Sequence, residues 1–306
     1  MVLPNFICVG AEKGGTTPLF RILVQHRDIF MPRNKETHYF TQLWNWKPLA
    51  FYEAHFFKGC AGERAVGEAT PEYMRFPEVP ARLSEALGRD LKLIFCLRDP
   101  VKRAFSQYHL RCRLMEETES FEVAVALEAK RTAANPYLGR RQAYLGGSRY
   151  LEQIERFLPH FPRENMFFMI LEEDLKENRA ATVSRLLDFL DVGPDPKIRL
   201  DVIDSSNAAP RVRFSSEARP IHSRTKTGRH RLPPGTIAFE TGNNWADSIV
   251  ERPSSYALDH FRRLARNLTV ELDEELARQL YRNEFKNEVD GLETFLGRDL
   301  SCWRRD

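Results

Sequence analysis

The sequence is short of long apolar runs, and we expect neither a membrane-spanning helix nor a signal peptide. No apolar run reaches the roughly 18 residues that a spanning helix needs, and no charged n-region precedes the first apolar run, FICVG, which leads directly into glycines. The five cysteines are an odd number without CxxC spacing, which argues against a zinc site. Cys8 and Cys96 lie inside apolar runs, so we expect reduced core thiols in a soluble, cytoplasmic protein.

A large net charge is also missing. The chain of 306 residues carries a formal net charge of +3, which by itself is too small to indicate a nucleic-acid partner. The 42% hydrophobic and 29% charged residues are ordinary for a globular protein and suggest neither disorder nor a coiled coil. The small positive charge suits an anionic small ligand equally well.

A lysine is absent from one expected position in the stretch GAEKGGTTPLF. A Walker A loop reads GxxxxGK[ST], yet here Thr16 follows the second glycine and the lysine lies upstream, at Lys13. β-forming residues precede the loop, and the apolar pattern of residues 16–26 predicts a helix with Thr16 as its N-cap. Strand, loop and helix together form a nest of backbone N–H groups that suits one terminal phosphate. The alternative is a tight turn without a ligand.

Strands and helices go on alternating as far as about residue 190. The expected strands are 64–68, 91–97 and 165–171, and the expected helices are 77–88, one from Pro100, 148–161 and 181–190. Such alternation gives right-handed crossovers and a parallel sheet covered on both faces. The predicted fold class is α/β, a P-loop-like three-layer fold with a central parallel sheet flanked by helices and a helical C-terminal part.

The pattern changes beyond residue 200. Residues 204–235 are polar and loop-like, with seven Lys/Arg from Arg211 to Arg231. Two helical patterns follow, YALDHFRRLARNL and DEELARQLYRNEF. We predict a single domain over residues 1–306, with a core at 3–195, a polar basic loop region at 204–250 and C-terminal helices at 255–303.

A candidate phosphate site follows the predicted strand 91–97. Arg98 comes just past the end of this strand, where ligands of open α/β sheets bind, and Ser106 lies on the next helix. An arginine together with a hydroxyl suits a phosphate monoester. The alternative is a surface arginine paired with Asp99 and a solvated serine.

Candidates for a general base lie in RNKETHYF, shortly after the first helix. Glu36 and His38 are two residues apart, so in an extended segment they share a face. The alternative is a charged loop that Tyr39 and Phe40 anchor.

Taken together, these segments resemble the sulfotransferases that use 3′-phosphoadenosine 5′-phosphosulfate (PAPS), in particular their bacterial and heparan-sulfate branch. EKGGTT resembles the family's 5′-phosphosulfate loop, and residues 98–108 match its 3′-phosphate motif RDPxxRxxSxY throughout. Residues 36–40 resemble the catalytic glutamate segment, GEATPEY the motif after it, and FLGRDLSCW the C-terminus of bacterial members. The resemblance covers residues 5–190 well, 270–303 fairly and 200–255 weakly.

The resemblance implies sulfuryl transfer from PAPS to a hydroxyl, with no obligatory metal. Lys13 would stabilise the leaving phosphate, and Glu36 would take the proton from the acceptor. His38 is the alternative base, because the steroid and phenol branch of the family uses a histidine. The residues that the resemblance assigns to PAPS are Lys13, Gly14, Gly15, Thr16 and Thr17 at the 5′-phosphate, and Arg98 and Ser106 at the 3′-phosphate.

The resemblance leaves the acceptor open among small metabolites, natural products and glycans. We expect a bacterial enzyme without nucleic-acid or membrane partners, and no motif indicates its oligomeric state. Ala69 stands where some heparan-type members carry a lysine, which weakens a polysaccharide assignment. Those members also close a K-G-R loop over the nucleotide, which Lys226, Gly228 and Arg229 match only loosely. The basic segment 211–231 is therefore either a solvated loop or a cover over PAPS or an anionic acceptor.

Two competing functions remain at this point. A P-loop nucleotide or small-molecule kinase is opposed by the displaced lysine and by the lack of a clear strand-end aspartate for Mg²⁺. A nucleotide-binding module without catalysis is opposed by the presence of both Lys13 and Glu36.

Overall fold

The computed structural model describes residues 2–114, 116–201 and 270–305, together with the backbones of five short strands between 211 and 246. The chain divides into two compact units. The first consists of residues 1–107, 125–202 and 272–306, and the second of residues 108–124 and 203–271. The single domain predicted for residues 1–306 stays a prediction.

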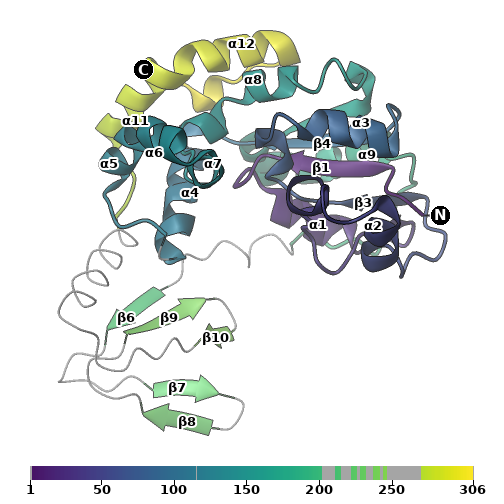
Figure 1. Cartoon of the computed structure of the whole chain (residues 1–306), viewed down its shortest axis with the longest axis horizontal. Coiled ribbons are helices and arrows are strands. Elements are labelled where there is room, and N and C mark those ends of the chain that lie inside the picture. Colours follow the sequence, from purple (N-terminus) through teal and green to yellow (C-terminus); the bar gives the residue numbers. More distant parts are fainter. Residues whose placement is uncertain are drawn as a thin grey trace. The chain divides into compact units, whose positions relative to one another are not determined.

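A five-stranded parallel sheet forms the centre of the first unit, with the strand order β2–β3–β1–β4–β5. Figure 1 labels its strands β1, β3 and β4. The strands are β1 (Phe6–Gly10), β2 (Ile29–Phe30), β3 (Ala65–Glu68), β4 (Lys92–Leu97) and β5 (Met166–Ile170). All five residues of β1 are buried, as expected for a strand in a sheet with both faces covered. The predicted α/β fold with a central parallel sheet is confirmed.

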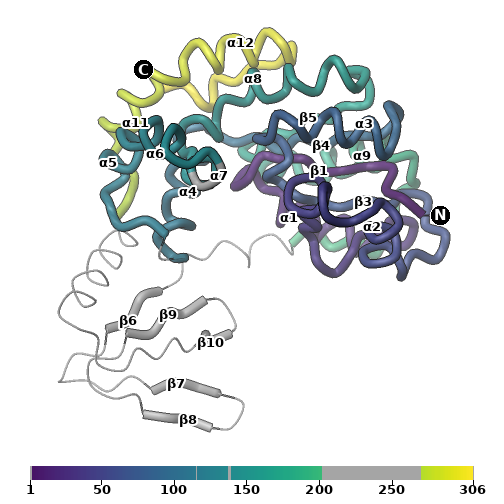
Figure 2. Tube along the Cα trace, viewed as in Figure 1, coloured from purple at the N-terminus to yellow at the C-terminus, as the bar shows by residue number. Residues whose placement is uncertain are grey.

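Helices follow and separate the strands, and most of them belong to the first unit, whereas the end of α4 and most of α5 belong to the second. They are α1 (Thr16–Leu23), α2 (Leu49–Phe56), α3 (Val79–Leu87), α4 (Pro100–Arg113), α5 (Phe121–Ala126), α6 (Glu128–Ala134), α7 (Pro136–Arg141), α8 (Tyr150–Glu155), α9 (Arg179–Phe189), α11 (Glu274–Leu280) and α12 (Lys286–Leu296). Figure 2 shows the C-terminal α12 beside α8, where the backbone N–H of Leu151 donates to the carboxylate of Glu288. The sequence pattern predicted the second of the two C-terminal helical segments, and the first lies outside the described residues.

The strand order reverses direction at β1. After β1 the chain passes to β2 and β3 on one side, and it then crosses to β4 and β5 on the other side. Ligands of open α/β sheets bind outside the carboxyl ends of the strands at such a point. Because all five strands are parallel, the segments that follow β1, β3, β4 and β5 leave the sheet at this same edge.

The cap of α1 differs from the prediction. Gly15, with a φ of 103°, occupies the N-cap position, and Thr16 is the first residue of the helix. This φ lies in the left-handed region, which glycine adopts without steric penalty because it has no Cβ. The threonine is therefore buried within the first turn, and its hydroxyl takes a different partner.

Two further segments differ from their predicted form. The helix expected at 148–161 is limited to α8, because Pro159 supplies no backbone N–H and disfavours helical geometry at the residue before it. The region 204–250, expected as a polar loop, contains short antiparallel strands. They are β6 (Arg211–Phe214), β7 (His222–Thr225), β8 (Gly228–Arg231), β9 (Ile237–Thr241) and β10 (Asn244–Ala246).

The strands β7 and β8 carry no alternation of apolar and polar residues in the sequence, which is why the pattern did not predict them. The strand β6, RVRF, does alternate, but over four residues only. Antiparallel pairing requires only backbone N–H and C=O groups, so a polar sequence can still adopt it. The question whether the basic segment 211–231 covers a cofactor falls outside the described residues.

The core thiols are as predicted. Cys8 and Cys96 are buried on adjacent strands, with their Sγ atoms 3.6 Å apart and both thiols free. In the described part of the chain, no helix is long and apolar enough to cross a bilayer.

We expect Gly14→Ala to destabilise the fold. A Cβ at this position would lie 2.0 Å from the carbonyl oxygen of Cys96, which belongs to the backbone of β4. Either the loop or the central strand would have to move, and we expect a loss of about 1–3 kcal/mol in the free energy of unfolding. Urea denaturation measures this loss.

Gly193→Ala is the matched control, because no atom lies within 4 Å of the Cβ that it would introduce. Its free energy of unfolding should stay within about 0.5 kcal/mol of the original value. Equal stability of the two variants would contradict the close approach of loop and strand.

Candidate active site

A buried carboxylate fastens the segment that carries both candidate bases. Glu68, at the end of β3, has no exposed surface. Its carboxylate accepts hydrogen bonds from the hydroxyls of Thr37 and Tyr52, both at 2.8 Å, of Tyr73 at 3.1 Å, and of Thr70. Burial raises the pKa of Glu68, although the four hydroxyl donors act in the opposite direction. Thr37, which stands between Glu36 and His38, is thereby held in place.

The structure brings the two candidate bases together. His38 adopts a left-handed backbone conformation, with a φ of 52°. Its Nε2 lies 3.5 Å from Oε2 of Glu36, and its Nδ1 is hydrogen-bonded to Oε1 of Glu72 at 2.8 Å. The segment is not extended as predicted, but Glu36 and His38 do face one another.

Charge around His38 raises its pKa above the ordinary value. Burial by itself would lower the pKa, but the hydrogen bond to Glu72 and the negative charges of Glu72, Glu36 and Glu68 outweigh that effect. Burial likewise acts to raise the pKa of Glu72, yet the hydrogen bonds from His38 and Thr41 lower it overall. His38 and Glu72 therefore form an imidazolium–carboxylate pair next to Glu36 at moderately acidic pH.

Lys35 links the candidate base to the phosphate loop. Its Nζ donates to Oε1 of Glu36 at 2.8 Å and to the hydroxyl of Thr16 at 3.1 Å. The Lys35 side chain is 13% exposed and that of Glu36 38%, so the ammonium is well covered while the carboxylate keeps access to solvent. Sequence reasoning missed Lys35, although its position next to Glu36 in RNKETHYF was a signal.

The loop after β1 lies directly against β4. The backbone N–H of Ala11 donates to the carbonyl of Cys96 at 2.7 Å, and the N–H of Gly14 donates to the carbonyl of Ala11 at 2.9 Å. Gly14 thus closes the turn with its own N–H group. Of the N–H groups that we predicted to bind the 5′-phosphate, those of Thr16 and Thr17 lie in the first turn of α1, where the helix itself offers no acceptor.

Arg98 reaches the same loop from the end of β4. Its Nη1 lies 3.5 Å from the carbonyl oxygen of Lys13, and its Nε lies 4.0 Å from a carboxylate oxygen of Glu172. That Nε is buried and has no hydrogen-bond partner among the described residues. The two predicted phosphate-binding segments therefore meet, and one guanidinium donor is available to an anion.

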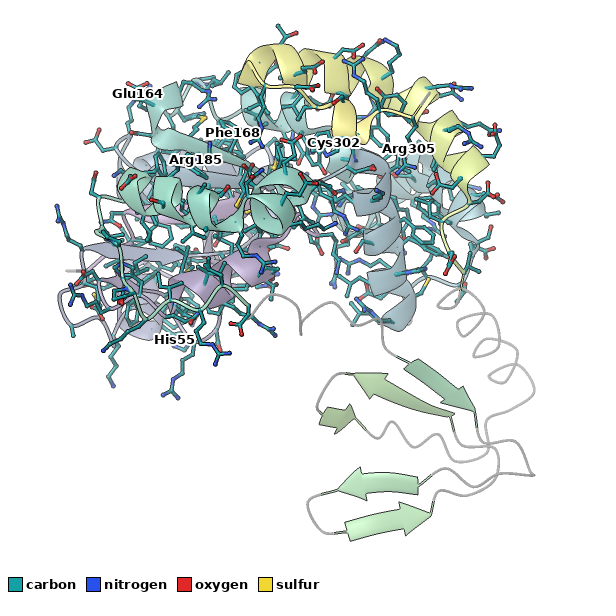
Figure 3. All side chains as sticks on the ribbon, turned by 180° about the vertical axis from the view of Figure 1, so that it is seen from behind. His55, Glu164, Phe168, Arg185, Cys302 and Arg305 are labelled. Atoms are coloured by element: carbon teal, nitrogen blue, oxygen red, sulfur yellow. The ribbon has the colours of Figure 1, made fainter. Side chains whose placement is uncertain are left out.

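Asp99 does not form an ion pair with Arg98, so the alternative reading of Arg98 as a surface arginine paired with Asp99 is not supported. Its Oδ1 accepts the backbone N–H groups of Val101 and Lys102, so it caps α4. Its Oδ2 accepts from Nη2 of Arg305 at 2.7 Å, and Figure 3 labels this arginine on the C-terminal segment. The C-terminus of the chain is thereby tied to the start of the helix that carries Ser106.

Ser106 lies midway along α4 and is half-buried. No hydrogen bond between its hydroxyl and Arg98 is present in the described part of the chain. A shared role for Ser106 and Arg98 at the 3′-phosphate therefore stays a prediction.

Two arginines contact Glu12, in the loop after β1. Nη2 of Arg75 lies 2.7 Å from Oε2 of Glu12, and Nη1 of Arg103 lies 3.4 Å from the Glu12 carbonyl. Arg103 is fully buried and also donates to the carbonyl of Tyr144 and the hydroxyl of Ser148. Burial lowers its pKa to about 10. The second arginine of the RDPxxR pattern therefore holds the loop rather than facing the site.

Comparisons with known proteins agree with this geometry. A family model described as "Sulfotransferase domain" matches residues 3–210. The crystal structure of a sulfotransferase from Alicyclobacillus acidocaldarius is similar over the whole of both chains, with a TM-score of 0.67 and 27% identity.

Curated relatives match a shorter part of the chain. The human heparan sulfate glucosamine 3-O-sulfotransferase 3B1 is 34% identical over 188 residues, which are 61% of this chain and 46% of the relative. The membrane-associated sulfotransferase kil1 of Dictyostelium discoideum is 37% identical over 122 residues, which are 39% of this chain and 26% of the relative. The aligned part of this chain thus spans about half the length of the human relative and about a quarter of the length of kil1.

The pair of His38 and Glu72 predicts a specific pH dependence. Its contribution to stability needs Glu72 ionised and His38 protonated. Because the pKa of His38 is raised in the folded protein, the stabilisation by His38 is fully present below pH 6.5, its ordinary pKa. This stabilisation is lost as the pH rises through the raised pKa. Because the pKa of Glu72 is lowered in the folded protein, the stabilisation by Glu72 is fully present above pH 4.5, its ordinary pKa. This stabilisation is lost as the pH falls through the lowered pKa. Glu72→Gln should therefore reduce stability most between those two pH values.

NMR titration of the His38 ring and unfolding at several pH values check this prediction. In Glu72→Gln the pKa of His38 should fall, because its nearest negative charge is gone. The control is Glu85→Gln, which removes an exposed carboxylate on α3 and should leave His38 unchanged. An unaltered His38 titration in Glu72→Gln would contradict the pairing.

Proposed function

Because the chain belongs to the sulfotransferase family, we propose that it transfers a sulfuryl group from PAPS to a hydroxyl of its acceptor. The observation that carries this proposal is the bridge from Thr16 through Lys35 to Glu36. It supports a site in which the proton acceptor lies beside the loop that would hold the 5′-phosphate. A kinase is not favoured, because the family is that of the sulfotransferases and Thr16 replaces the Walker A lysine.

The residues at the strand ends fit the two phosphates of PAPS. Gly14 leaves no side chain between the loop and β4, and the first turn of α1 presents N–H groups to a phosphate. The buried Nε of Arg98 has no hydrogen-bond partner in the described structure, only the carboxylate of Glu172 at 4.0 Å, and the guanidinium charge suits a second phosphate. When bound, PAPS supplies the sulfuryl group and a leaving phosphate. Lys13, Gly15, Thr16 and Thr17 would hold its 5′-phosphate, and Arg98 and Ser106 its 3′-phosphate.

In this proposal Glu36 takes the proton of the acceptor hydroxyl as the acceptor oxygen bonds to sulfur. Lys13 would stabilise the leaving phosphate, because its ammonium would offset the negative charge left on the bridging oxygen by the electron pair of the broken S–O bond. His38 contacts the second carboxylate oxygen of Glu36 and, when protonated, keeps it oriented. The contact between His38 and Glu72 supports His38 as a partner of the base rather than as the base itself.

A groove lined by the residues that precede Lys35 and Glu36 in the chain supports an anionic acceptor. It has a volume of about 520 Å³, and its lining contains Arg33, His55 and Lys58 but no carboxylate. These three side chains are exposed, and Figure 3 labels His55. Phe30 and Phe56 add aromatic faces on which a sugar ring can pack. The groove wall formed by residues 30–34 continues along the chain into Lys35 and Glu36.

We therefore favour an anionic glycan or a related sugar metabolite as acceptor. The name of the human relative gives its substrate as a glucosamine of heparan sulfate, which agrees with this choice. The absence of a lysine at Ala69 argues against equating the two substrates. A bacterial origin and a cytoplasmic location stay proposals.

Nucleotide binding and sulfuryl transfer together test the function. Adenosine 3′,5′-bisphosphate should raise the melting temperature of the protein, and ATP with Mg²⁺ should not match it, because only the former carries both phosphates that the site would bind. Lys13→Ala and Glu36→Gln should each lower transfer from labelled PAPS about 100-fold or more. Arg98→Ala should mainly weaken nucleotide affinity.

Glu36→Gln is also the internal control, because it keeps its size and should still bind adenosine 3′,5′-bisphosphate. Full activity in this variant would assign the base to His38. Stabilisation by ATP with Mg²⁺ alone would overturn the sulfotransferase proposal.

The groove predicts a charge-dependent Michaelis constant. In the variant Arg33→Ser/Lys58→Ser, KM for a sulfated or carboxylated glycan should rise about tenfold with little change in kcat, because both cations would act in binding rather than in chemistry. The effect should shrink at high salt. Lys176→Ser removes an exposed charge outside the groove and serves as control. An unchanged KM in the groove variant would exclude the groove as the binding site of the acceptor.

A further inference from the structure

We propose that Lys35 is a positioning residue of the transfer site, which fixes the carboxylate of Glu36 against the first turn of α1. The proposal rests on the proposed function and deepens it. It assigns a role to a residue that neither the Walker-type loop nor the glutamate motif identifies.

The ammonium group of Lys35 connects two elements of the site. Its two contacts, to Oε1 of Glu36 at 2.8 Å and to the hydroxyl of Thr16 at 3.1 Å, join elements that are twenty positions apart in the sequence. A lysine ammonium has three donors in a tetrahedral arrangement, so two contacts define its position. A charged donor to a carboxylate is among the stronger hydrogen bonds in a protein.

The backbone of Lys35 is itself held by a hydrogen bond. Its carbonyl accepts the backbone N–H of Ala69 at 3.1 Å, immediately after β3. Two residues further on, Thr37 donates to the buried Glu68 at 2.8 Å. The segment between these anchors has little freedom, so the short distance from Nζ to Glu36 reflects a fixed arrangement rather than a chance approach of two surface chains.

The two carboxylate oxygens of Glu36 have different partners. Lys35 holds Oε1, and Nε2 of His38 lies 3.5 Å from Oε2. A proton acceptor has to lie within hydrogen-bond reach of the acceptor hydroxyl and in line with the group transferred. Without Lys35 the carboxylate would keep, among the described residues, the longer contact with His38, and it could rotate away from Thr16. A displacement of about 1 Å in such a site lowers the rate on the order of 100-fold.

A purely structural ion pair would behave differently. Loss of such a pair would lower stability and leave the rate of transfer per folded molecule unchanged. Loss of a group that only holds the nucleotide through Thr16 would weaken nucleotide binding and transfer together. A positioning residue changes kcat and leaves nucleotide affinity nearly constant.

The experiment compares Lys35→Met, Lys35→Arg, Glu36→Gln and the double variant Lys35→Met/Glu36→Gln. Lys35→Met, which keeps the length of the side chain without its charge, should lower kcat about 10- to 100-fold. Calorimetric titration with adenosine 3′,5′-bisphosphate, in the absence of acceptor, should give a dissociation constant within about threefold of the original. Lys35→Arg should recover part of the rate, because a guanidinium can still donate to both oxygens.

The double variant tests whether Lys35 acts through Glu36. In the Glu36→Gln background the change of Lys35 to Met should have almost no further effect, because the group that it positions is already lost. Lys176→Met, an exposed lysine on another segment, is the matched control and should keep full kcat.

Three results would overturn the proposal. They are an unchanged kcat in Lys35→Met, a loss of nucleotide affinity as large as the loss of kcat, and a multiplicative loss in the double variant. Absence of transfer by the unaltered protein, despite binding of adenosine 3′,5′-bisphosphate, would instead overturn the proposed function and this role with it. The first three results leave the proposed function intact, so the two failures are distinguishable.

Discussion

The candidate site depends on one buried carboxylate. Glu68 ends β3 without exposed surface, and its partners are hydroxyl groups rather than a cation. A buried carboxylate is unfavourable unless its oxygens are satisfied, so the four donors must remain where they are for the fold to persist. One of them, Thr37, stands between Glu36 and His38. The energetic demand of an internal group thus fixes the conformation of two partly exposed ones.

Parallel topology then determines what this segment meets. The order β2–β3–β1–β4–β5 brings the segments after four strands to one edge of the sheet. The loop with Lys13 follows β1, and Arg98 follows β4. Their contact at 3.5 Å, and the contact of Lys35 with Thr16 at 3.1 Å, connect three parts of the chain that are distant in sequence. Each contact is a charged donor on an oxygen, which suits a site that has to accept the anionic groups of a nucleotide.

The structure of the loop shows what occupies the position at which a Walker A loop has its lysine. Gly14 packs against the backbone of Cys96, and Gly15 takes a left-handed conformation before α1, so the chain enters the helix through glycines alone. Thr16, in the place of the Walker A lysine, is buried and accepts a hydrogen bond from Lys35. A lysine from another segment therefore comes near the position that a Walker A lysine would occupy, and it brings the candidate base with it. This arrangement agrees with membership of the sulfotransferase family.

The sequence by itself determined the alternation of strands and helices, the loop between β1 and α1 and the segment after β4, and it named Glu36 and His38 as alternative bases. These features depend on local periodicity, on glycine and on residues close together in the chain, so they can be read without coordinates. Sequence reasoning did not identify Lys35 as a bridge, Glu72 as the partner of His38, or Arg305 as the partner of Asp99. It also misjudged the cap of α1 and the strands β6 to β10. Only the tertiary structure decided these points, because each depends on atoms from distant segments, and the choice of partner for a charged side chain follows from the path of the whole chain rather than from its neighbours in sequence.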